Sequence, residues 1–460
     1  MNQTKINRTK LNQRKLPINL IAILCLVTAM GNLNAKEISE AKPEREGLSS
    51  DRLERITEHM NDRVADGTMV GGHGLIARNG KIVYSELYGQ ADREAGTPMS
   101  EDSIYRIYSM TKPITGVALM MLYEEGRFFL NDPVAKYIPE LANLEVALST
   151  AGTNIISDGT QSRTVGEGND DLVGQTRKPM RQPTVRDLLT HTAGFTYGVF
   201  GNTEVDQQYR EAGLMGPETN LQNFVEALGK IPLQYEPGTQ WHYSVSVDIQ
   251  GRLVEVLSGM SFYEFLRTRI FEPLDMPDTY FTLPADKLPR LAQLYAPKGV
   301  QGGNFFAEST GPGLDVAHPA VSRGYVEGTK FESGGGGLVS TTRDYLRFAQ
   351  MMLNGGELDG VRLLSPKTVE LMTMNHLGDI PMGFNRTGAG FGLGFGLVLN
   401  PGDVGEVSSA GEYNWGGAAG TRFWIDPQEN LIGIFMVQSI PHRTRLGQEF
   451  KVLTYQALTE

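Results

Sequence analysis

Segments with β-strand patterns lie near the two ends of the chain, and helical patterns fill the part between them. Two β-prone runs flank Asn79-Gly80 between positions 74 and 84, which is a strong signal for a β-hairpin. Further β patterns follow much later, at 394–399, 421–425 and 431–438. Strands so far apart in sequence predict one antiparallel sheet, flanked by helices, to which both ends of the chain contribute.

Helical periodicity predicts most of the remaining structure. Apolar residues recur every three or four positions in these segments: 51–65, 109–125, 185–189, 221–228, 247–258, 262–270, 342–353 and 446–458. The pattern predicts an α/β (α+β) fold, with an α/β lobe from about 45–108 and 335–460 and an inserted, mainly helical lobe from about 109–334. A chain of 460 residues is long enough for such a two-lobed unit.

The first 35 residues have the layout of a secretory signal peptide. Five basic residues and no acidic residue precede an apolar run at 16–30, and Ala35 offers a small residue for cleavage. The run is interrupted by Pro17 and falls short of the roughly 20 residues that a spanning helix needs. We therefore expect removal of residues 1–35, a mature domain at 36–460 that is periplasmic or secreted, and no stable membrane anchor.

The composition narrows the possible partners and cofactors. The formal net charge is −11, and loss of the basic leader would make the chain more acidic still, which argues against nucleic acid or anionic lipid as a partner. The only cysteine, Cys25, lies in the predicted leader, so the mature chain would have no disulfide and no thiolate nucleophile. The seven histidines show no metal-ligand spacing, and we expect neither a metal nor another cofactor.

Ser109-Met110-Thr111-Lys112 places a serine and a lysine at the start of a helix that is apolar on nearly all sides. The spacing of i to i+3 brings the two side chains to one face of the helix. A serine hydroxyl needs a neighbouring base to become a nucleophile, and a lysine can be that base when burial lowers its pKa. Ser109 and Lys112 are therefore candidate catalytic residues.

Six sequence blocks occur in an order that resembles the serine β-lactamase and penicillin-binding superfamily, specifically the class C β-lactamases and family VIII carboxylesterases. The blocks are Tyr108 to Lys112, Leu130 to Pro133, Thr184 to Gly194, Tyr243 to Val245, Gly334 to Ser340 and Trp415 to Gly417. The resemblance spans roughly residues 45 to 458. It implies a β-lactamase-like fold and a reaction through an acyl-enzyme.

The resemblance also implies the roles of individual residues. Ser109 would form the acyl-enzyme, and Lys112 would share or take its proton. Tyr243 would occupy the position from which a phenol next to a cationic lysine passes a proton to the leaving group.

Trp415-Gly416-Gly417 falls where lactamases carry Lys-Thr-Gly, on the strand beside the active site. By that correspondence, the backbone N–H groups of Ser109 and Ala418 form the oxyanion hole. Trp415, Gly416 and Gly417 would line the substrate site. Glycines suit a strand that must approach a substrate closely.

Two other patterns have structural interpretations. His191 and His242 could suggest a serine-histidine triad, but His191 lies in a block that is structural in the resemblance, and the chain contains no Gly-x-Ser-x-Gly motif. The glycine run at 334–337 lacks the Lys-Ser/Thr that follows in a phosphate-binding loop. We expect it to be a close-packing turn ahead of a helix.

Two positions depart from the lactamase pattern, because Val245 stands in place of Asn and Trp415 stands in place of Lys. Lactamases use the lost groups to hold the amide and the carboxylate of the substrate, whereas an aromatic wall suits an apolar acyl or alcohol group. We therefore expect a serine hydrolase that cleaves small-molecule carboxylic esters, with weak activity at most towards β-lactam substrates. The alternatives are an acyltransferase (transesterase), a β-lactamase or D-alanyl carboxypeptidase and, with least support, a ligand-binding member without catalysis.

Overall fold

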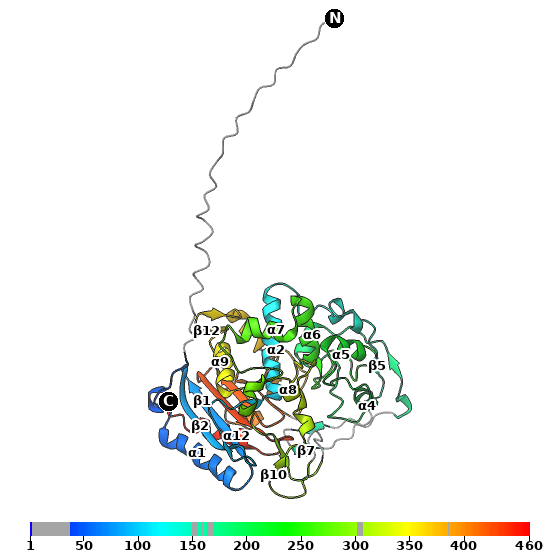
Figure 1. Ribbon diagram of the computed structural model, residues 1–460. Coiled ribbons are helices and arrows are strands. Elements are labelled where there is room, and N and C mark those ends of the chain that lie inside the picture. Colours follow the sequence, from blue (N-terminus) through cyan, green and yellow to red (C-terminus); the bar gives the residue numbers. More distant parts are fainter. Residues whose placement is uncertain (2–36, 150–154, 158–159, 163–169, 301–306, 385) are drawn as a thin grey trace. The chain divides into compact units, whose positions relative to one another are not determined.

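The structure is a computed structural model that describes Met1 and residues 37–149, 155–157, 160–162, 170–300, 307–384 and 386–460. Glu37–Glu460 form one compact unit (Figure 1). The predicted signal segment at 1–35 lies, apart from Met1, outside the described residues, so its removal stays a prediction. No helix in the described ranges is both long enough and apolar enough to cross a membrane.

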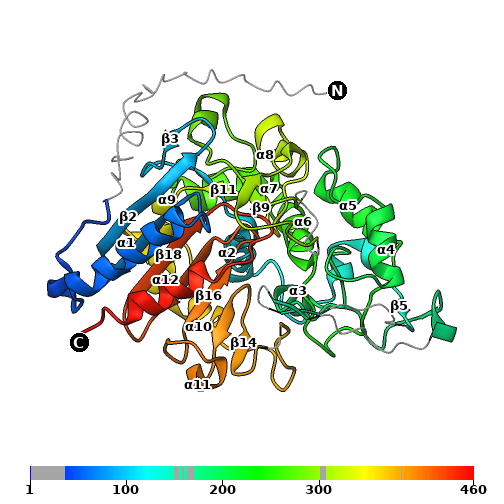
Figure 2. The ribbon, with the colours of Figure 1, turned by 90° about the horizontal axis from the view of Figure 1, so that it is seen from below.

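An eight-stranded antiparallel sheet has the order β14-β15-β16-β17-β18-β1-β2-β3 (Figure 2). Its strands are β1 (Gly71–Arg78), β2 (Lys81–Asp92), β3 (Thr97–Pro98), β14 (Ala389–Phe391), β15 (Gly396–Val398), β16 (Tyr413–Gly416), β17 (Arg422–Asp426) and β18 (Leu431–Val437). Strand β1 pairs with β18, so the two ends of the chain meet inside the sheet. The predicted fold class, with a sheet built from both ends of the chain, is confirmed.

Short strand pairs lie outside this sheet. They are β4 (Tyr105–Arg106) with β11 (Val339–Ser340), β5 (Val146–Ala147) with β8 (Thr176–Arg177), β6 (Ile155–Ser157) with β7 (Thr160–Ser162), β9 (Tyr295–Pro297) with β10 (Leu314–Val316), and β12 (Glu357–Leu358) with β13 (Val361–Arg362). The α-helices are α1 (Ser50–Ala65), α2 (Thr111–Glu124), α3 (Val185–Leu189), α4 (Glu204–Glu211), α5 (Leu221–Leu228), α6 (Ser246–Ser258), α7 (Phe262–Leu266), α8 (Arg323–Glu327), α9 (Thr342–Leu353), α10 (Pro366–Met372), α11 (Pro401–Val404) and α12 (Leu446–Tyr455).

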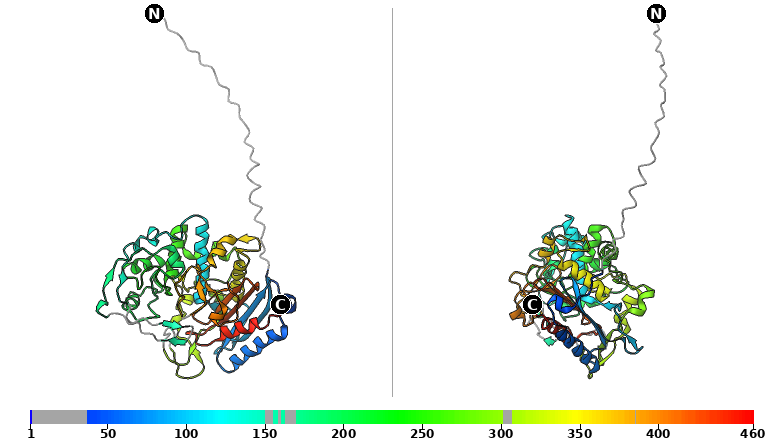
Figure 3. Two further views of the ribbon diagram at one scale, coloured as in Figure 1. Left: turned by 180° about the vertical axis from the view of Figure 1, so that it is seen from behind. Right: turned by 90° about the vertical axis from the view of Figure 1, so that its left-hand side faces the viewer.

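Alternate residues of β18 face two separate hydrophobic cores, as the two-residue period of a strand requires. Phe435 belongs to the core beneath α1 and α12, which lie side by side on this face (Figure 3). Ile434 and Met436 belong to the larger core, which also contains side chains of α2, α6 and α9. At Gly433, a Cβ atom would lie 2.1 Å from the ring of Trp424, so the glycine leaves room for this indole.

Helix α2 carries the candidate catalytic lysine and is buried from Thr111 to Leu122, as its apolar pattern predicts. It packs against α6 in the helical part of the fold. The predicted helix at 262–270 is α7 followed by a π-helical turn, Arg267–Phe271. Helix α2 differs from the prediction at its start, because residues 108–110 form a 3-10 turn.

Candidate active site

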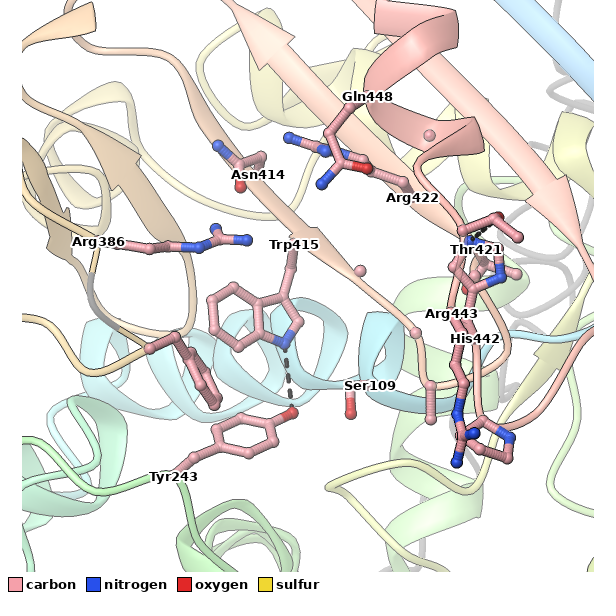
Figure 4. A pocket seen from close by; sticks show the side chains of 18 of the residues that line it. Ser109, Tyr243, Arg386, Asn414, Trp415, Thr421, Arg422, His442, Arg443 and Gln448 are labelled. Atoms are coloured by element: carbon pink, nitrogen blue, oxygen red, sulfur yellow. Dashed lines mark hydrogen bonds between the residues drawn. The ribbon is translucent and has the colours of Figure 1, made fainter. Parts of the chain in front are cut away.

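Ser109 lies in the 3-10 turn Tyr108–Met110, which leads directly into α2. Tyr108 has a φ of 42°, in the left-handed region that residues other than glycine rarely occupy. The turn brings Ser109 to a cavity of about 320 Å³ (Figure 4). The serine is therefore placed where a small molecule can reach it.

Lys112 is buried in the first turn of α2, with 1% of its surface exposed. Its Nζ atom lies 3.2 Å from Ser109 Oγ, 2.9 Å from the Tyr197 hydroxyl and 2.5 Å from the backbone carbonyl of Gly335. Burial lowers the pKa of Lys112 to about 7, and the charge of Asp248 opposes this shift. A lysine with such a pKa is partly deprotonated at neutral pH and can accept a proton from the neighbouring serine.

Asp248 in α6 contributes a buried carboxyl group to this cluster. Its Oδ1 atom accepts hydrogen bonds from the Ser333 hydroxyl at 2.6 Å and from the Gly335 N–H at 3.1 Å. Burial raises the pKa of Asp248, while the Ser333 hydrogen bond and the charge of Lys112 lower it. Gly335 therefore connects the two ionisable groups through its backbone, and a Cβ atom there would lie 2.6 Å from the Tyr197 hydroxyl.

Tyr243 lies beside the serine, and its ring faces the lysine. Lys112 Nζ is 4.4 Å from the centroid of the Tyr243 ring. The Trp415 indole N–H donates to the Tyr243 hydroxyl at 3.3 Å (Figure 4). Burial raises the pKa of Tyr243, and hydrogen bonds from Ser109 and Trp415 offset part of that rise. The hydroxyl that hydrogen-bonds Lys112 directly is that of Tyr197, a residue outside the sequence-based candidates.

The end of β16 runs along the cavity, and Gly416, Gly417 and Ala418 line it together with Ser109. The two residues proposed from sequence for the oxyanion hole, Ser109 and Ala418, thus lie at one cavity. At Gly417 the close approach is to the protein itself, because a Cβ atom would lie 2.4 Å from the backbone carbonyl of Ile107. This glycine also holds the strand end against the segment that precedes the serine.

The two histidines near the site hydrogen-bond to hydroxyl groups of the scaffold. His191 Nδ1 lies 3.4 Å from Ser244 Oγ, and His242 Nε2 lies 3.4 Å from Thr196 Oγ1. Burial lowers the pKa of His191 and lowers that of His242 to about 4. Both rings are therefore neutral near pH 7 and fit the structural interpretation.

The cavity combines aromatic surface with cationic side chains. Its aromatic lining residues are Phe200, Tyr243, Phe384 and Trp415, and its arginines are Arg386, Arg422 and Arg443. Trp415 has 8% of its surface exposed, and its ring packs against Tyr243 and Phe391. An elongated apolar group with a polar or anionic end matches such a surface.

Sequence reasoning missed Tyr197 and Asp248. Asp248 stands between Val247 and Ile249 on a buried helix, three residues after Val245. An acid on a buried helical face is a usable signal, although an acid in a first helical turn has an ordinary interpretation as a partner of the helix dipole. Tyr197 carries no local signal, because only the packing of its loop against α2 and Gly335 brings it to the lysine.

Comparisons with known proteins agree with this geometry. Residues 56–450 match the family described as Beta-lactamase. An uncharacterized protein of Mycobacterium tuberculosis is 31% identical over 389 residues, which span 82% of this chain and 87% of the relative. Esterase EstB of Burkholderia gladioli is 27% identical over 382 residues, or 81% of this chain and 86% of the relative.

A solved structure shows the same fold. The structure of EstCE1, described as a hydrolase with promiscuous acyltransferase activity, has a TM-score of 0.68 at 23% identity and covers 88% of this chain and 99% of that chain. The family match extends from α1 into α12 and includes the serine, the lysine and the end of β16. The chain therefore belongs to the β-lactamase family, within the serine β-lactamase and penicillin-binding superfamily, and it is a serine hydrolase.

Proposed function

We propose that this protein cleaves carboxylic esters through an acyl-enzyme on Ser109, with Lys112 as the base. The observation that carries the proposal is the 3.2 Å distance between Lys112 Nζ and Ser109 Oγ, at a lysine whose pKa is lowered by burial to about 7. Ser109 Oγ attacks the ester carbonyl carbon while Lys112 takes the hydroxyl proton. The carbon–oxygen bond to the alcohol then breaks, and water releases the acid from the serine by the reverse proton path.

Tyr243 is proposed to carry the proton to the leaving alcohol. Tyr243 lines the cavity together with Ser109, and its ring lies against Lys112, so the phenol, the lysine and the attacking oxygen lie at one place. A phenol is a weak acid and base near neutral pH, so the lysine charge under its ring is needed to make proton transfer fast.

The backbone N–H groups of Ser109 and Ala418 are proposed to bind the carbonyl oxygen as it becomes an oxyanion. Both residues line the cavity beside the hydroxyl group that attacks. Backbone donors need no reorganisation during the reaction. Removing one donor from an oxyanion hole generally lowers the rate by about 10²- to 10³-fold.

The substrate class follows from the wall that surrounds the serine. Trp415 stands where a lactamase would carry a lysine, and Phe200 and Phe384 add apolar surface to the same cavity, which favours esters over β-lactams. The similarity to an enzyme named esterase, EstB, agrees with this choice. Transfer of the acyl group to an alcohol is the second candidate, because the same open cavity admits an alcohol in place of water.

The test is a substrate panel with a matched pair of serine variants. Wild-type protein should hydrolyse 4-nitrophenyl esters and react with a fluorophosphonate probe, and nitrocefin hydrolysis should be slower. Ser109→Ala should lose ester hydrolysis by about 10³-fold or more and should lose labelling, because the covalent nucleophile is gone. Ser100→Ala, outside the cavity lining, should retain both; ester hydrolysis that survives Ser109→Ala would refute the proposal.

We also propose that the protein is exported and that residues 1–35 are removed. The basic start and the short apolar run of this segment support that assignment. Mass spectrometry of the protein from periplasmic and medium fractions should find a mature N-terminus near residue 36. An intact N-terminus on cytoplasmic protein would contradict export.

A further inference from the structure

The charged side chains that line the cavity all have the same sign. They are Arg386, Arg422 and Arg443, and no aspartate or glutamate is found among the described residues of this lining. The chain as a whole carries a formal net charge of −11. The cavity therefore opposes the charge of the molecule around it, and a low-dielectric pocket with one sign of charge attracts the opposite sign.

Arg422 Nη2 lies 2.8 Å from the Glu406 carboxylate, and the charge of Arg386 also acts on this carboxylate. One carboxylate thus faces two of the three arginines, and the lining keeps a net positive charge. Arg386 and Arg443 lie on opposite sides of Ser109, with Trp415 between Arg386 and the serine (Figure 4). Arg443 belongs to the loop between β18 and α12 and donates to the backbone carbonyl of Ala307.

The cavity thus has apolar surface next to the serine and guanidinium groups at two ends. A guanidinium binds a carboxylate through paired, charge-assisted hydrogen bonds, which are stronger than those between neutral groups. Trp415 has replaced the lysine of the lactamase pattern, so recognition of an anion at this site would come from other elements of the fold.

We propose that the preferred substrates are esters that carry a carboxylate, with an apolar body against Trp415 and Phe384 and the carboxylate on Arg386 or Arg443. This inference rests on the proposed ester hydrolysis and names its substrate class. The two arginines lie on either side of the serine, and the acyl and alcohol parts of a bound ester extend to opposite sides of the attacked carbonyl carbon. One arginine would therefore bind a carboxylate on the acyl group, and the other would bind a carboxylate on the leaving alcohol.

The experiment uses two pairs of esters, in each of which a carboxylate is compared with its uncharged methyl ester. 3-Acetoxybenzoate and its methyl ester place the charge on the leaving group, whereas mono-4-nitrophenyl suberate and its methyl ester place it on the acyl group. Wild-type protein should favour the anionic member of one pair by at least about tenfold in kcat/KM, and added salt should reduce this preference.

Variants then identify the arginine. In Arg386→Gln or Arg443→Gln, the ratio of kcat/KM for the anionic ester over the neutral ester should fall by about tenfold, mainly through KM. The matching Lys variant should recover part of the ratio. Arg323→Gln, which removes an exposed arginine paired with Glu327 outside the cavity lining, should leave the ratio unchanged.

The outcomes separate this inference from the proposed function. Equal kcat/KM values within both pairs, or a ratio unaffected in Arg386→Gln, Arg443→Gln and their double variant, would overturn the carboxylate subsite. Hydrolysis of the neutral esters that depends on Ser109 would still uphold the esterase. Failure to hydrolyse any ester would instead reject the proposed function and the inference that rests on it.

Discussion

Lys112 and Lys451 are both fully buried, with 1% of their surface exposed, yet their surroundings differ. Lys451 in α12 donates to the buried Glu412 carboxylate at 2.8 Å. Lys112 donates to a serine hydroxyl, a tyrosine hydroxyl and a backbone carbonyl, none of which carries a charge. Burial lowers the pKa of both lysines. A carboxylate charge opposes the shift in each case, but Asp248 acts on Lys112 without a direct hydrogen bond, whereas Glu412 hydrogen-bonds Lys451.

The difference shows that burial alone does not mark a catalytic lysine. A buried ammonium group with a carboxylate partner gains back part of its desolvation cost, so the pair holds the fold together. A buried ammonium group whose direct hydrogen-bond partners are uncharged has less compensation, here only the charge of Asp248, and gives up its proton more readily. The choice of partner therefore separates a lysine suited to proton transfer from one suited to structure.

The largest expected effect is the loss of activity in Lys112→Met. Without the proton acceptor, kcat/KM for a neutral nitrophenyl ester should fall by about 10³-fold. The unfolding free energy should change less than in Lys451→Met, because the substitution removes a buried charge that has no hydrogen-bonded counter-ion. Steady-state kinetics and urea unfolding measure the two quantities. An active Lys112→Met enzyme would show that Lys112 is no more catalytic than Lys451.

Lys451→Met should have the opposite profile. It leaves the Glu412 carboxylate buried without its cation, and breaking a buried ion pair in this way costs about 3–5 kcal/mol of unfolding free energy. Activity per folded molecule should stay close to wild type, because Lys451 lies outside the cavity lining. Denaturant titration measures the loss, and unchanged stability would mean that the pair is already neutral in the folded protein.

The pH dependence of kcat/KM should follow the protonation of Lys112. For a neutral ester, kcat/KM should be flat above about pH 7 and fall by up to tenfold for each pH unit below it, as the lysine becomes protonated. The unfolded state binds this proton up to pH ~10.4, so the stability of wild type relative to Lys112→Met should rise with pH between about 7 and 10. A rate that is constant from pH 5 to 9 would exclude Lys112 as the proton acceptor.

Trp415→Lys should have the smallest effect on activity. The variant adds a third lysine, which can be compared with Lys112 and Lys451. The new ammonium group would lie at an aromatic wall open to the cavity, so it could pair with a substrate carboxylate. The ratio of kcat/KM for an apolar nitrophenyl ester over that for a cephalosporin should fall at least about tenfold, or roughly 1.4 kcal/mol. Equal losses for both substrates would show that Trp415 supports the strand and does not select substrate.

Sequence patterns predicted the helices and strands that have the clearest apolar periodicity or runs of β-prone residues. Helices α5 and α9 have the predicted bounds, and β1, β2, β17 and β18 lie within two residues of the predicted segments at most of their ends. The start of α2 could not be predicted, because the left-handed conformation of Tyr108 is imposed by tertiary contacts and not by its own residue type. Helices α4 and α10 were also missed. In α4, only Val205 and Tyr209 are apolar, which is too few to show a period.

The candidate site also contains residues that the sequence could predict and residues that it could not. Ser109 and Lys112 could be paired from their spacing, since three residues along a helix bring side chains together whatever surrounds them. Tyr197 and Asp248 could not, because their distance to Lys112 depends on how a loop, α6 and the glycine run at 334–337 pack. The resemblance supplied Trp415 as an aromatic wall, but the arginines of the same cavity come from three separate segments and leave no common pattern.

One hydrogen-bond acceptor of Lys112, the backbone carbonyl of Gly335, cannot be removed by amino-acid substitution. Every amino acid at position 335 supplies the same carbonyl oxygen, so no codon change removes the acceptor 2.5 Å from Lys112 Nζ. Substitutions at Ser109 or Tyr197 can delete the other two partners and still leave the lysine tethered. Only chemical replacement of the backbone amide that contains this carbonyl by an ester weakens the hydrogen bond to Lys112. Natural variation around the cavity can therefore retune the chemistry without releasing the lysine from its place.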